Sequence, residues 1–364
     1  MRRRDVLIGG SALAVVAAGA TVLVDEQMGS ASEYDAAMAM MRAPLSVQAE
    51  ALDMVRYATL APNGHNAQPW LFRAGKNRIE ILPDFARRTP VVDPDDHHLF
   101  ISLGCAAENL ALASAARGRP GTLTFDPRAD GSIAFNSVAG PSISSELFEA
   151  IPRRQSTRSN YNGHPVSADD LKTLAAAAAL PGVDLILITD RPQIDRVRDL
   201  VVSGNNSQMA DAAFMRELKS WLRFNPRQAA ETGDGLYSAA SGSPALPGWL
   251  GPRAFDMFVT AKSEEERYSR QLQSSSGVAV FVGAKDDREH WVRVGRACQR
   301  FALQATALGL KHAFVNQPVE VPALRPELTS LVGMPGRRPD IVMRFGHGAS
   351  LPFSARRPAR IVAS

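Results

Sequence analysis

The sequence predicts an α+β protein in which two related half-domains are fused as an intramolecular pseudo-dimer. Its 364 residues, 45% hydrophobic and 21% charged, are enough for one large core or two smaller ones. Helical and extended patterns alternate beyond residue 45, which is typical of mixed α and β structure. A long helical pattern also occurs twice, which indicates an internal duplication.

Composition excludes several classes of protein. The 41 Lys and Arg residues against 37 Asp and Glu give a net charge of +4, too mild for a dedicated nucleic-acid binder. Cys105 and Cys298 offer neither a disulfide scaffold nor the spacing of zinc ligands. We therefore expect no nucleic-acid partner and no metal-stabilised fold.

Residues 1–32 form a segment separate from the fold, with the pattern of an export signal. Arginines at positions 2–4 precede an uncharged apolar stretch at 6–24. The paired arginines followed by Asp5 resemble a twin-arginine signal, which is read by a translocase that exports folded proteins. The stretch is also just long enough for an N-terminal anchor. We expect cleavage, with anchoring as the alternative and membrane contact only through residues 6–24.

The first predicted half covers residues 46–145. A helix is expected at 46–60, capped by Ser46 and stopped by the cluster Pro62-Asn63-Gly64. Two extended runs, a long helix and two more extended runs follow, at 70–73, 78–82, 96–117, 121–126 and 132–138.

The second predicted half covers residues 146–362 and repeats much of this order. Its expected elements are helices starting at 167 and 190, a long helix at 286–308, and extended runs at 183–189, 277–283, 312–315 and 340–345. Residues 225–252 are rich in Gly, Ser and Pro, so we expect a loop or lid inserted there.

The two long helices show the duplication most directly. Residues 104–118 align with residues 295–309 at an offset of 191, and six of the fifteen positions are identical. Small residues recur on both helices and would let them approach closely, as expected at the pseudo-twofold axis of a fused dimer.

Residues 61–70 are the densest run of unusual residues in the chain. Asn66 and Gln68 each offer amide donors and a carbonyl acceptor, which suit the edge of a heteroaromatic ring. Pro69 favours an extended conformation at Gln68. The alternative is an ordinary turn from helix to strand with Trp70 in the core.

Two further segments gather guanidinium groups beside hydroxyl groups. Residues 153–158 contain three arginines with a serine and a threonine, and residues 346–358 contain the pair Arg356 and Arg357. Arginine forks bind phosphate oxygens in a bidentate manner, so each segment is a candidate phosphate clamp. Solvated basic linkers are the alternative.

These three segments together resemble the FMN-dependent nitroreductase family, in particular its branch with two fused half-domains that acts in flavin reduction or storage. The likeness covers residues 46–362. Its most specific parts are the Ala-Pro-Asn…Asn-x-Gln-Pro-Trp stretch at 61–70 and the Arg-rich phosphate motif at 154–158.

The resemblance implies a nitroreductase-like α+β fold and FMN as the cofactor. The cofactor-binding residues that it implies are Asn66, Gln68, Trp70, Arg154, Ser156, Arg158, Asn316, Gln317, Arg356 and Arg357. No catalytic side chain is assigned, because the hydride chemistry belongs to the flavin.

The sequence also departs from the family's pattern. The Asn-rich segment lies in the first half and the Arg-rich segment begins the second, so each half has kept one motif. Residues 179–183, where the second half would repeat the first motif, contain no amide side chain. We therefore expect one complete FMN site, formed between the halves.

The resulting prediction is an exported FMN-dependent oxidoreductase of nitroreductase type, periplasmic or anchored to the inner membrane. It would pass electrons by ping-pong hydride transfer from an unknown reductant to a small nitroaromatic or quinone-like acceptor. The alternative is a non-catalytic flavoprotein that sequesters FMN beneath the 225–252 segment.

Two remaining residue pairs are expected to be structural. His97 and His98 are neighbours on a predicted helix and would point in different directions, so we expect a surface pair and no metal site. Cys105 and Cys298 lie on the two aligned helices. We expect two buried free thiols there, with a disulfide as the alternative.

Overall fold

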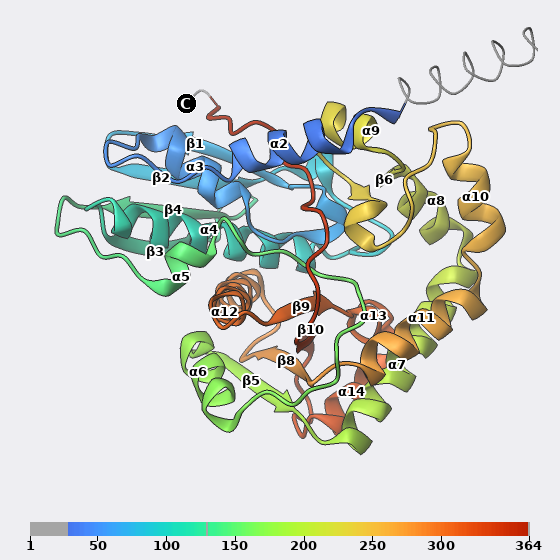
Figure 1. Cartoon of the computed structure of the whole chain (residues 1–364). Helices are drawn as coiled ribbons and strands as arrows, with labels where there is room; N and C mark the ends of the chain where they lie inside the picture. Colours follow the sequence, from blue (N-terminus) through green and yellow to red (C-terminus); the bar gives the residue numbers. More distant parts are fainter. Residues whose placement is uncertain (1–27, 129, 363–364) are drawn as a thin grey trace, which may run out of the picture.

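The computed structural model describes residues 28–128 and 130–362. Within them the chain forms two halves, each with a four-stranded antiparallel sheet, and two long helices lie between the sheets (Figure 1). The predicted export segment lies outside the described residues except for its end, from Met28 onward.

The first half contains a sheet with the order β1-β2-β4-β3. Its strands are β1 (Trp70–Ala74), β2 (Arg78–Pro83), β3 (Gly121–Asp126) and β4 (Ser132–Ser137). Its helices are α2 (Ala31–Met41), α3 (Ala51–Thr59), α4 (His97–Ala116) and α5 (Glu146–Ala150). Burial alternates along β2, with Ile79 and Ile81 inside, so that one face of the sheet packs on α4.

The second half contains a sheet with the order β5-β8-β10-β9. Its strands are β5 (Val183–Ile188), β8 (Gly277–Gly283), β9 (Lys311–Phe314) and β10 (Pro339–Gly346). Its helices include α6 (Ala168–Ala178), α12 (Arg288–Ala307), α13 (Gln317–Glu320) and α14 (Arg325–Leu331). Helices cover both faces, because Phe281 of β8 joins the core around α12 while Val280 and Val282 join a second core.

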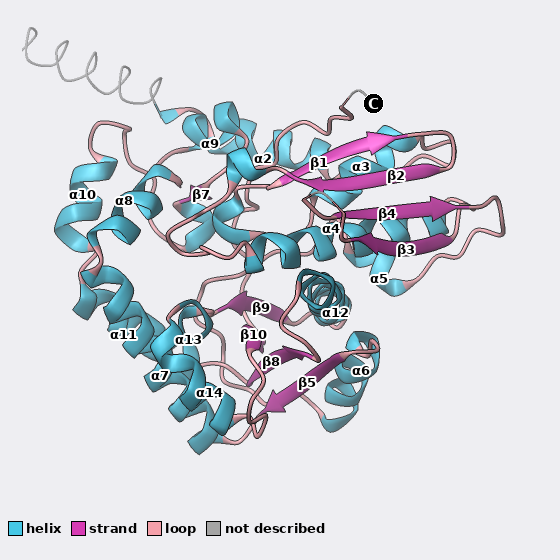
Figure 2. Ribbon diagram, turned by 180° about the vertical axis from the view of Figure 1, so that it is seen from behind, coloured by secondary structure: helices cyan, strands magenta, loops and turns pink. Residues whose placement is uncertain are grey.

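The two halves have the same topology. In each, a helix precedes the first strand, a long helix follows the second, and the strands stand in the same spatial order. The view from behind shows the two sheets on either side of the paired long helices (Figure 2). This arrangement confirms the predicted α+β fold of two related, fused halves.

Helices α4 and α12 cross at the pseudo-twofold axis through two glycines. A Cβ atom at Gly104 would lie 2.1 Å from the carbonyl oxygen of Val292, and one at Gly295 would lie 2.0 Å from that of Ile101. These contacts exchange under the 191-residue offset that aligns the helices in the sequence. The small residues noted in the sequence are therefore needed where the two backbones touch.

The halves differ most in what joins their first two strands. Residues 75–77 connect β1 to β2, whereas residues 189–276 separate β5 from β8. We call residues 189–276 the insertion. It contains the helices α7 (Arg191–Ala210), α8 (Ala212–Ser220), α9 (Pro226–Thr232), α10 (Gly251–Phe258) and α11 (Ala261–Gln273), with the short strands β6 (Leu222–Arg223) and β7 (Leu236–Tyr237).

The insertion is longer than the loop predicted at 225–252 and contains more helix and strand. Pro226 occupies the first turn of α9 and Gly233 ends it in the left-handed conformation with φ 63°. Both residues are common at those two positions of a helix. The composition that suggested a loop partly reflects the ends of short helices.

The predicted start of the first helix is also wrong. α3 begins at Ala51, after a capping box in which the Glu50 amide donates to the Asp53 carboxylate at 3.0 Å. Ser46 lies in the preceding segment, where its carbonyl oxygen accepts a hydrogen bond from Arg117. That tertiary contact holds Ser46 away from the helix.

One helix of the described chain, α4, is long and apolar enough to cross a membrane. Its most apolar window, however, is 78% buried inside the protein. The high hydropathy of α4 is explained by its place in the core between the sheets.

Candidate functional site

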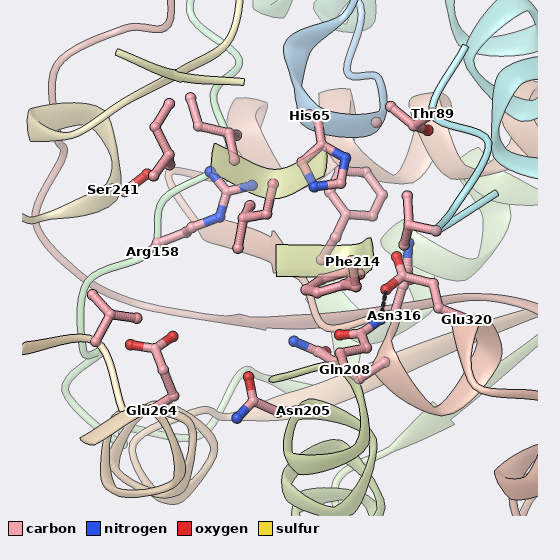
Figure 3. Close-up of a pocket in the computed structure, with 18 of the residues that line it drawn as sticks. His65, Thr89, Arg158, Asn205, Gln208, Phe214, Ser241, Glu264, Asn316 and Glu320 are labelled. Atoms are coloured by element: carbon pink, nitrogen blue, oxygen red, sulfur yellow. Dashed lines mark hydrogen bonds between the residues drawn. The ribbon is translucent and has the colours of Figure 1, made fainter. Parts of the chain in front are cut away.

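A cavity of about 510 Å³ lies where the two halves and the insertion meet. The first half contributes residues 62–65 and one face of α4, and the second half contributes Phe314, Gln317 and Ile341. The insertion contributes much of the remaining wall, including apolar side chains of α8 and α10. Figure 3 shows one of them, Phe214 of α8, pointing into the cavity. The size and the apolar lining are those of a small-molecule site.

The loop between α3 and β1 carries backbone strain beside this cavity. His65, Asn66 and Gln68 have φ values of 47°, 54° and 56°, a conformation that side chains other than glycine seldom adopt. The side-chain Oδ1 atom of Asn63 holds the turn by accepting from the backbone N–H of Gln68 at 2.7 Å. The loop thereby presents Pro62, Asn63, Gly64 and His65 to the cavity.

Asn66 and Gln68 are used differently from the prediction. The Asn66 amide donates to the carbonyls of Gly235 and Ala355, each at 3.0 Å, and the Gln68 amide donates to the carbonyl of Gly233 at 2.8 Å. Neither side chain lines the cavity. Their amides fasten the insertion and the C-terminal segment to the first half, so they do not address a ligand there.

Trp70 also lies outside the cavity. It is buried in the shared hydrophobic core as the first residue of β1. This is the structural alternative considered for Trp70 from the sequence.

Arg158 is the predicted phosphate residue that the structure places in the cavity wall. Within the described chain, no hydrogen bond or ion pair engages its guanidinium group, whereas nearby Arg267 is paired with Glu264. Burial lowers the pKa of Arg158, with Arg267 adding to the effect. An unpaired guanidinium beside an apolar cavity is suited to bind an anionic group.

Arg154 and Ser156 do not line the cavity. Arg154 is buried and donates to the carbonyl of Leu60 at 3.0 Å, while its Nε and Nη1 atoms have no partner in the part of the chain that the structure describes. Burial lowers the pKa of Arg154 to about 10. Ser156 lies in an isolated backbone bridge with His312 at the edge of the second sheet.

Arg356 and Arg357, the second predicted phosphate clamp, do not line the cavity. The Arg356 guanidinium donates to the carbonyls of Thr59 and Ala61 and to the Asn66 side chain, at 2.7 to 3.0 Å. These are carbonyls at the C-terminal end of α3, where a cation compensates the free acceptors. Arg357 donates to the Gln68 carbonyl at 2.6 Å, so both side chains serve the fold.

Asn316 and Gln317 do line the cavity, as the resemblance implied. The side-chain Oδ1 atom of Asn316 accepts from the backbone N–H of Val342 at 2.9 Å, which holds the residue against β10. Gln317 is 8% exposed and its Oε1 atom has no partner within the described chain. Gln317 therefore keeps an acceptor available beside the cavity.

Several cavity residues were not predicted from the sequence. They include the aromatic side chains Phe214, Phe224, Phe255 and Phe258 of the insertion, together with His65, Gln208 and Glu320. The Gln208 amide donates to Glu320 at 2.6 Å, and burial raises the pKa of Glu320. No short motif marks the residues on α7, α8 and α10, because such helices resemble ordinary packing helices. His65 lies within the unusual run at 61–70, which the sequence did single out.

His65 faces the same part of the cavity as Arg158 (Figure 3). Burial lowers the pKa of His65 to about 4, and the charges of Arg158 and His98 act in the same direction. The imidazole is therefore neutral at neutral pH.

His97 and His98 are not the surface pair that was expected. His97 is fully buried, and the side chain of His98 is 12% exposed. The first turn of α4 is covered by β10 residue Asp340 and by the cavity wall. His97 and His98 can both be buried although they point in different directions, because β10 lies on one side of this helix end and the cavity wall on the other.

Cys105 and Cys298 are both buried and free, which confirms the expected state. The Cys105 thiol lines the cavity and donates to the carbonyl of Gly295 at 3.1 Å. Burial raises the pKa of Cys298. Both thiols belong to the close crossing of α4 and α12.

No protein-family model matches the chain. A Mycobacterium tuberculosis protein, found in two strains, is 28% identical over 311 residues, which cover 79% of this chain and 82% of the relative. Its name assigns it provisionally to the NAD(P)H nitroreductases. The similarity thus extends over most of both chains.

Solved structures of nitroreductases are also similar to parts of the chain. One with bound FMN from Desulfitobacterium hafniense covers 61% of this chain and 100% of its own, with a TM-score of 0.38 and 16% identity. An FMN-dependent nitroreductase from Mycobacterium smegmatis, in complex with NADPH, covers 56% and 87%, with a TM-score of 0.37 and 11% identity.

Proposed function

We propose that the chain is an FMN-dependent oxidoreductase of the nitroreductase type. It accepts hydride from NAD(P)H and passes electrons to a small nitroaromatic or quinone-like acceptor. The observation that carries this proposal is the unpaired guanidinium of Arg158 in an apolar cavity between the halves. The name of the M. tuberculosis relative supports the reaction type and the nicotinamide donor.

The chemistry of the cavity fits FMN, which combines an apolar ring, polar ring edges and an anionic phosphate. Arg158 would hold the phosphate by charge-assisted hydrogen bonds. The side-chain Oε1 atom of Gln317, which has no partner within the described residues, would accept a hydrogen bond from a polar edge. The phenyl rings of the insertion would cover the ring system and exclude water.

FMN when bound supplies the hydride and electron transfer. The chain contributes binding, orientation and a proton source. Glu320 lines the cavity, and because burial raises the pKa of Glu320, its carboxyl group keeps a proton to a higher pH than an exposed glutamate would. This carboxyl oxygen is the group from which we expect a proton to reach a reduced acceptor.

Two measurements test the proposal. The purified protein, reconstituted with FMN if necessary, should show flavin absorption in the visible range. Rapid mixing with NADPH under anaerobic conditions should then bleach that absorption, and a quinone should restore it. A protein that stays colourless after reconstitution would contradict the FMN site itself.

The alternative is an FMN-sequestering protein without turnover. The observation that favours it is the insertion, whose helices supply so much of the cavity wall that a bound flavin would lie beneath them. In that case the protein binds FMN with the same Arg158 contact, but NADPH leaves the flavin oxidised. The rapid-mixing experiment therefore separates the two functions.

We also propose that the protein is exported by the twin-arginine route. The arginines at 2–4 and the apolar stretch at 6–24 support this, and a translocase for folded proteins suits a protein that must acquire its cofactor before crossing. Changing Arg2 and Arg3 to lysine should shift the protein from the periplasmic to the cytoplasmic fraction. Unchanged fractionation would contradict the proposal.

A further inference from the structure

Three potential metal ligands meet at the start of α4. One ligand atom from each of Asp93, His97 and His98 lies within 4.8 Å of the other two. The Nδ1 atom of His98 and the Oδ1 atom of Asp93 are 3.9 Å apart, too far for a hydrogen bond. Two ligands on one tetrahedral ion lie about 3.4 Å apart, so a small side-chain rotation would bring both onto one ion.

The hydrogen bond of His97 leaves its Nδ1 atom available to bind a metal. Its Nε2 atom lies 2.7 Å from the Oδ1 atom of Asp340. Its Nδ1 atom finds no partner among residues 28–128 and 130–362, although the residue is fully buried. An Nε2–H that donates to a carboxylate leaves a lone pair on Nδ1. A carboxylate behind a histidine is the usual support of a metal-ligating imidazole.

Helix capping explains only part of this arrangement. The Asp93 carboxylate accepts the amides of His98 and Leu99 at 3.0 and 2.9 Å, which accounts for its presence at the helix start. These capping hydrogen bonds come from backbone N–H groups and do not involve the imidazole rings of His97 and His98. Among the described residues, the Nδ1 atom of His97 is buried without a hydrogen-bond partner, which is unfavourable for a polar atom.

The charges around the cluster suit a divalent cation. The carboxylates of Asp93 and Asp340 would together balance its charge. Nearby arginines are already paired, Arg88 with Asp96 at 3.1 Å and Arg338 with Asp95 at 2.6 Å. Asp340 is itself fixed in place, because its second carboxylate oxygen accepts the Gly283 amide at 2.6 Å.

We propose that Asp93, His97 and His98 bind one divalent transition-metal ion of the zinc class, with Asp340 positioning His97. Two imidazoles and one carboxylate leave at least one coordination position open. Asp93 and His98 line the cavity, so the open position faces it, on the side where Glu320 also lies. This inference is independent of the proposed flavin function.

Zinc chloride alone is the probe for this site. Tag-free protein, stripped with a chelator and then dialysed, should bind one zinc ion per chain in a calorimetric titration. Cobalt(II) should bind at the same stoichiometry and give visible absorption bands typical of nitrogen and oxygen ligands. Absence of stoichiometric binding by either ion would overturn the proposal.

Variants assign the ligands. His98→Gln should weaken zinc binding at least tenfold, and Asp340→Asn should weaken it about 10- to 100-fold, as for other supports of a ligating histidine. The control is His290→Gln, since His290 forms a similar contact with Asp287 at 2.7 Å outside the cluster and should leave affinity unchanged.

A thermal melt of each variant separates ligand loss from misfolding. If Asp340→Asn does not fold, His98→Gln decides the question, because the His98 side chain makes no hydrogen bond within the described residues. Wild-type affinity in His98→Gln would overturn the assignment.

Discussion

The guanidinium groups of Arg158 and Arg356 differ in their hydrogen-bond partners. The Arg356 guanidinium donates hydrogen bonds to carbonyls at the end of α3 and to Asn66. The Arg158 guanidinium has no partner in the described chain. Both stood out in the sequence as candidate phosphate ligands. The difference lies in the acceptors nearby. A guanidinium that meets free carbonyl oxygens stabilises the fold, and one that meets none is available to bind a ligand.

Replacing Arg158 with alanine should weaken FMN binding. Each charge-assisted hydrogen bond contributes about 1.5–3 kcal/mol, so the dissociation constant should rise about 10- to 150-fold. Fluorescence titration with FMN measures this change. Arg153→Ala is the matched control, because Arg153 is exposed in the same segment, and equal losses in both variants would contradict the role of Arg158.

His65 should make the stability of the protein depend on pH. Its pKa is about 4 when folded and about 6.5 when unfolded, so between these values the unfolded state binds more protons. This contribution to stability is present above pH 6.5 and is lost as pH falls toward 4. His97 and His312, whose pKa values are also lowered by burial, act in the same direction.

His65→Asn isolates this contribution, since asparagine tolerates the φ of 47° at this position. Urea unfolding at pH 7 and pH 5 should show a smaller loss of stability in the variant, by on the order of 1 kcal/mol. Identical losses in the variant and the wild type would show that His65 does not titrate as described.

At the scale of elements, the boundaries of short helices were the hardest to predict. The patterns at 97–116 and 288–307 are long enough for periodicity to place both helices almost fully. In the insertion, helices of seven and eight residues begin at Pro226 and Gly251, where proline and glycine suggested a loop. Such helices are held by tertiary packing, which a local pattern does not contain.

The crossing of α4 and α12 gives a test in which two effects oppose each other. Helix propensity alone predicts that Gly104→Ala and Gly295→Ala stabilise the protein by about 1 kcal/mol. Packing predicts destabilisation by about 3 kcal/mol or more, because each new Cβ would meet a backbone oxygen at 2.1 or 2.0 Å. Thermal and urea unfolding should show the second result.

Gly64→Ala is the control for this experiment. A Cβ at Gly64 would meet no atom of the described residues within 4 Å, so the stability should change little. If Gly104→Ala were as stable as Gly64→Ala, the two long helices would not be in close contact at that glycine.

At the scale of the whole molecule, the symmetry of the fold does not extend to the cavity. Ile101, Ser102 and Cys105 of α4 line it, and the 191-residue offset relates them to Val292, Arg293 and Arg296. There the two arginines are paired, with Glu289 at 2.5 Å and with Glu108 at 2.8 Å. On α12, these paired side chains therefore stand where α4 has its cavity-lining residues.

We therefore expect one FMN per chain. Flavin released by heat, quantified by absorbance against protein from amino-acid analysis, should give a ratio close to one after full reconstitution. A ratio of two would contradict the asymmetric site and would require a second cavity on the other side of the paired helices.

The sequence by itself determined the two-half architecture, the long helices and the loop at 62–65, because periodicity, duplication and turn chemistry are local properties. It also singled out Arg158, Asn316 and Gln317, which do line the cavity. Only the tertiary structure decided that Asn66, Gln68 and Arg356 serve the fold and that His97 is buried against Asp340. The physical reason is that the role of a polar side chain depends on which acceptors and donors surround it, and here those partners lie more than 150 residues away along the chain.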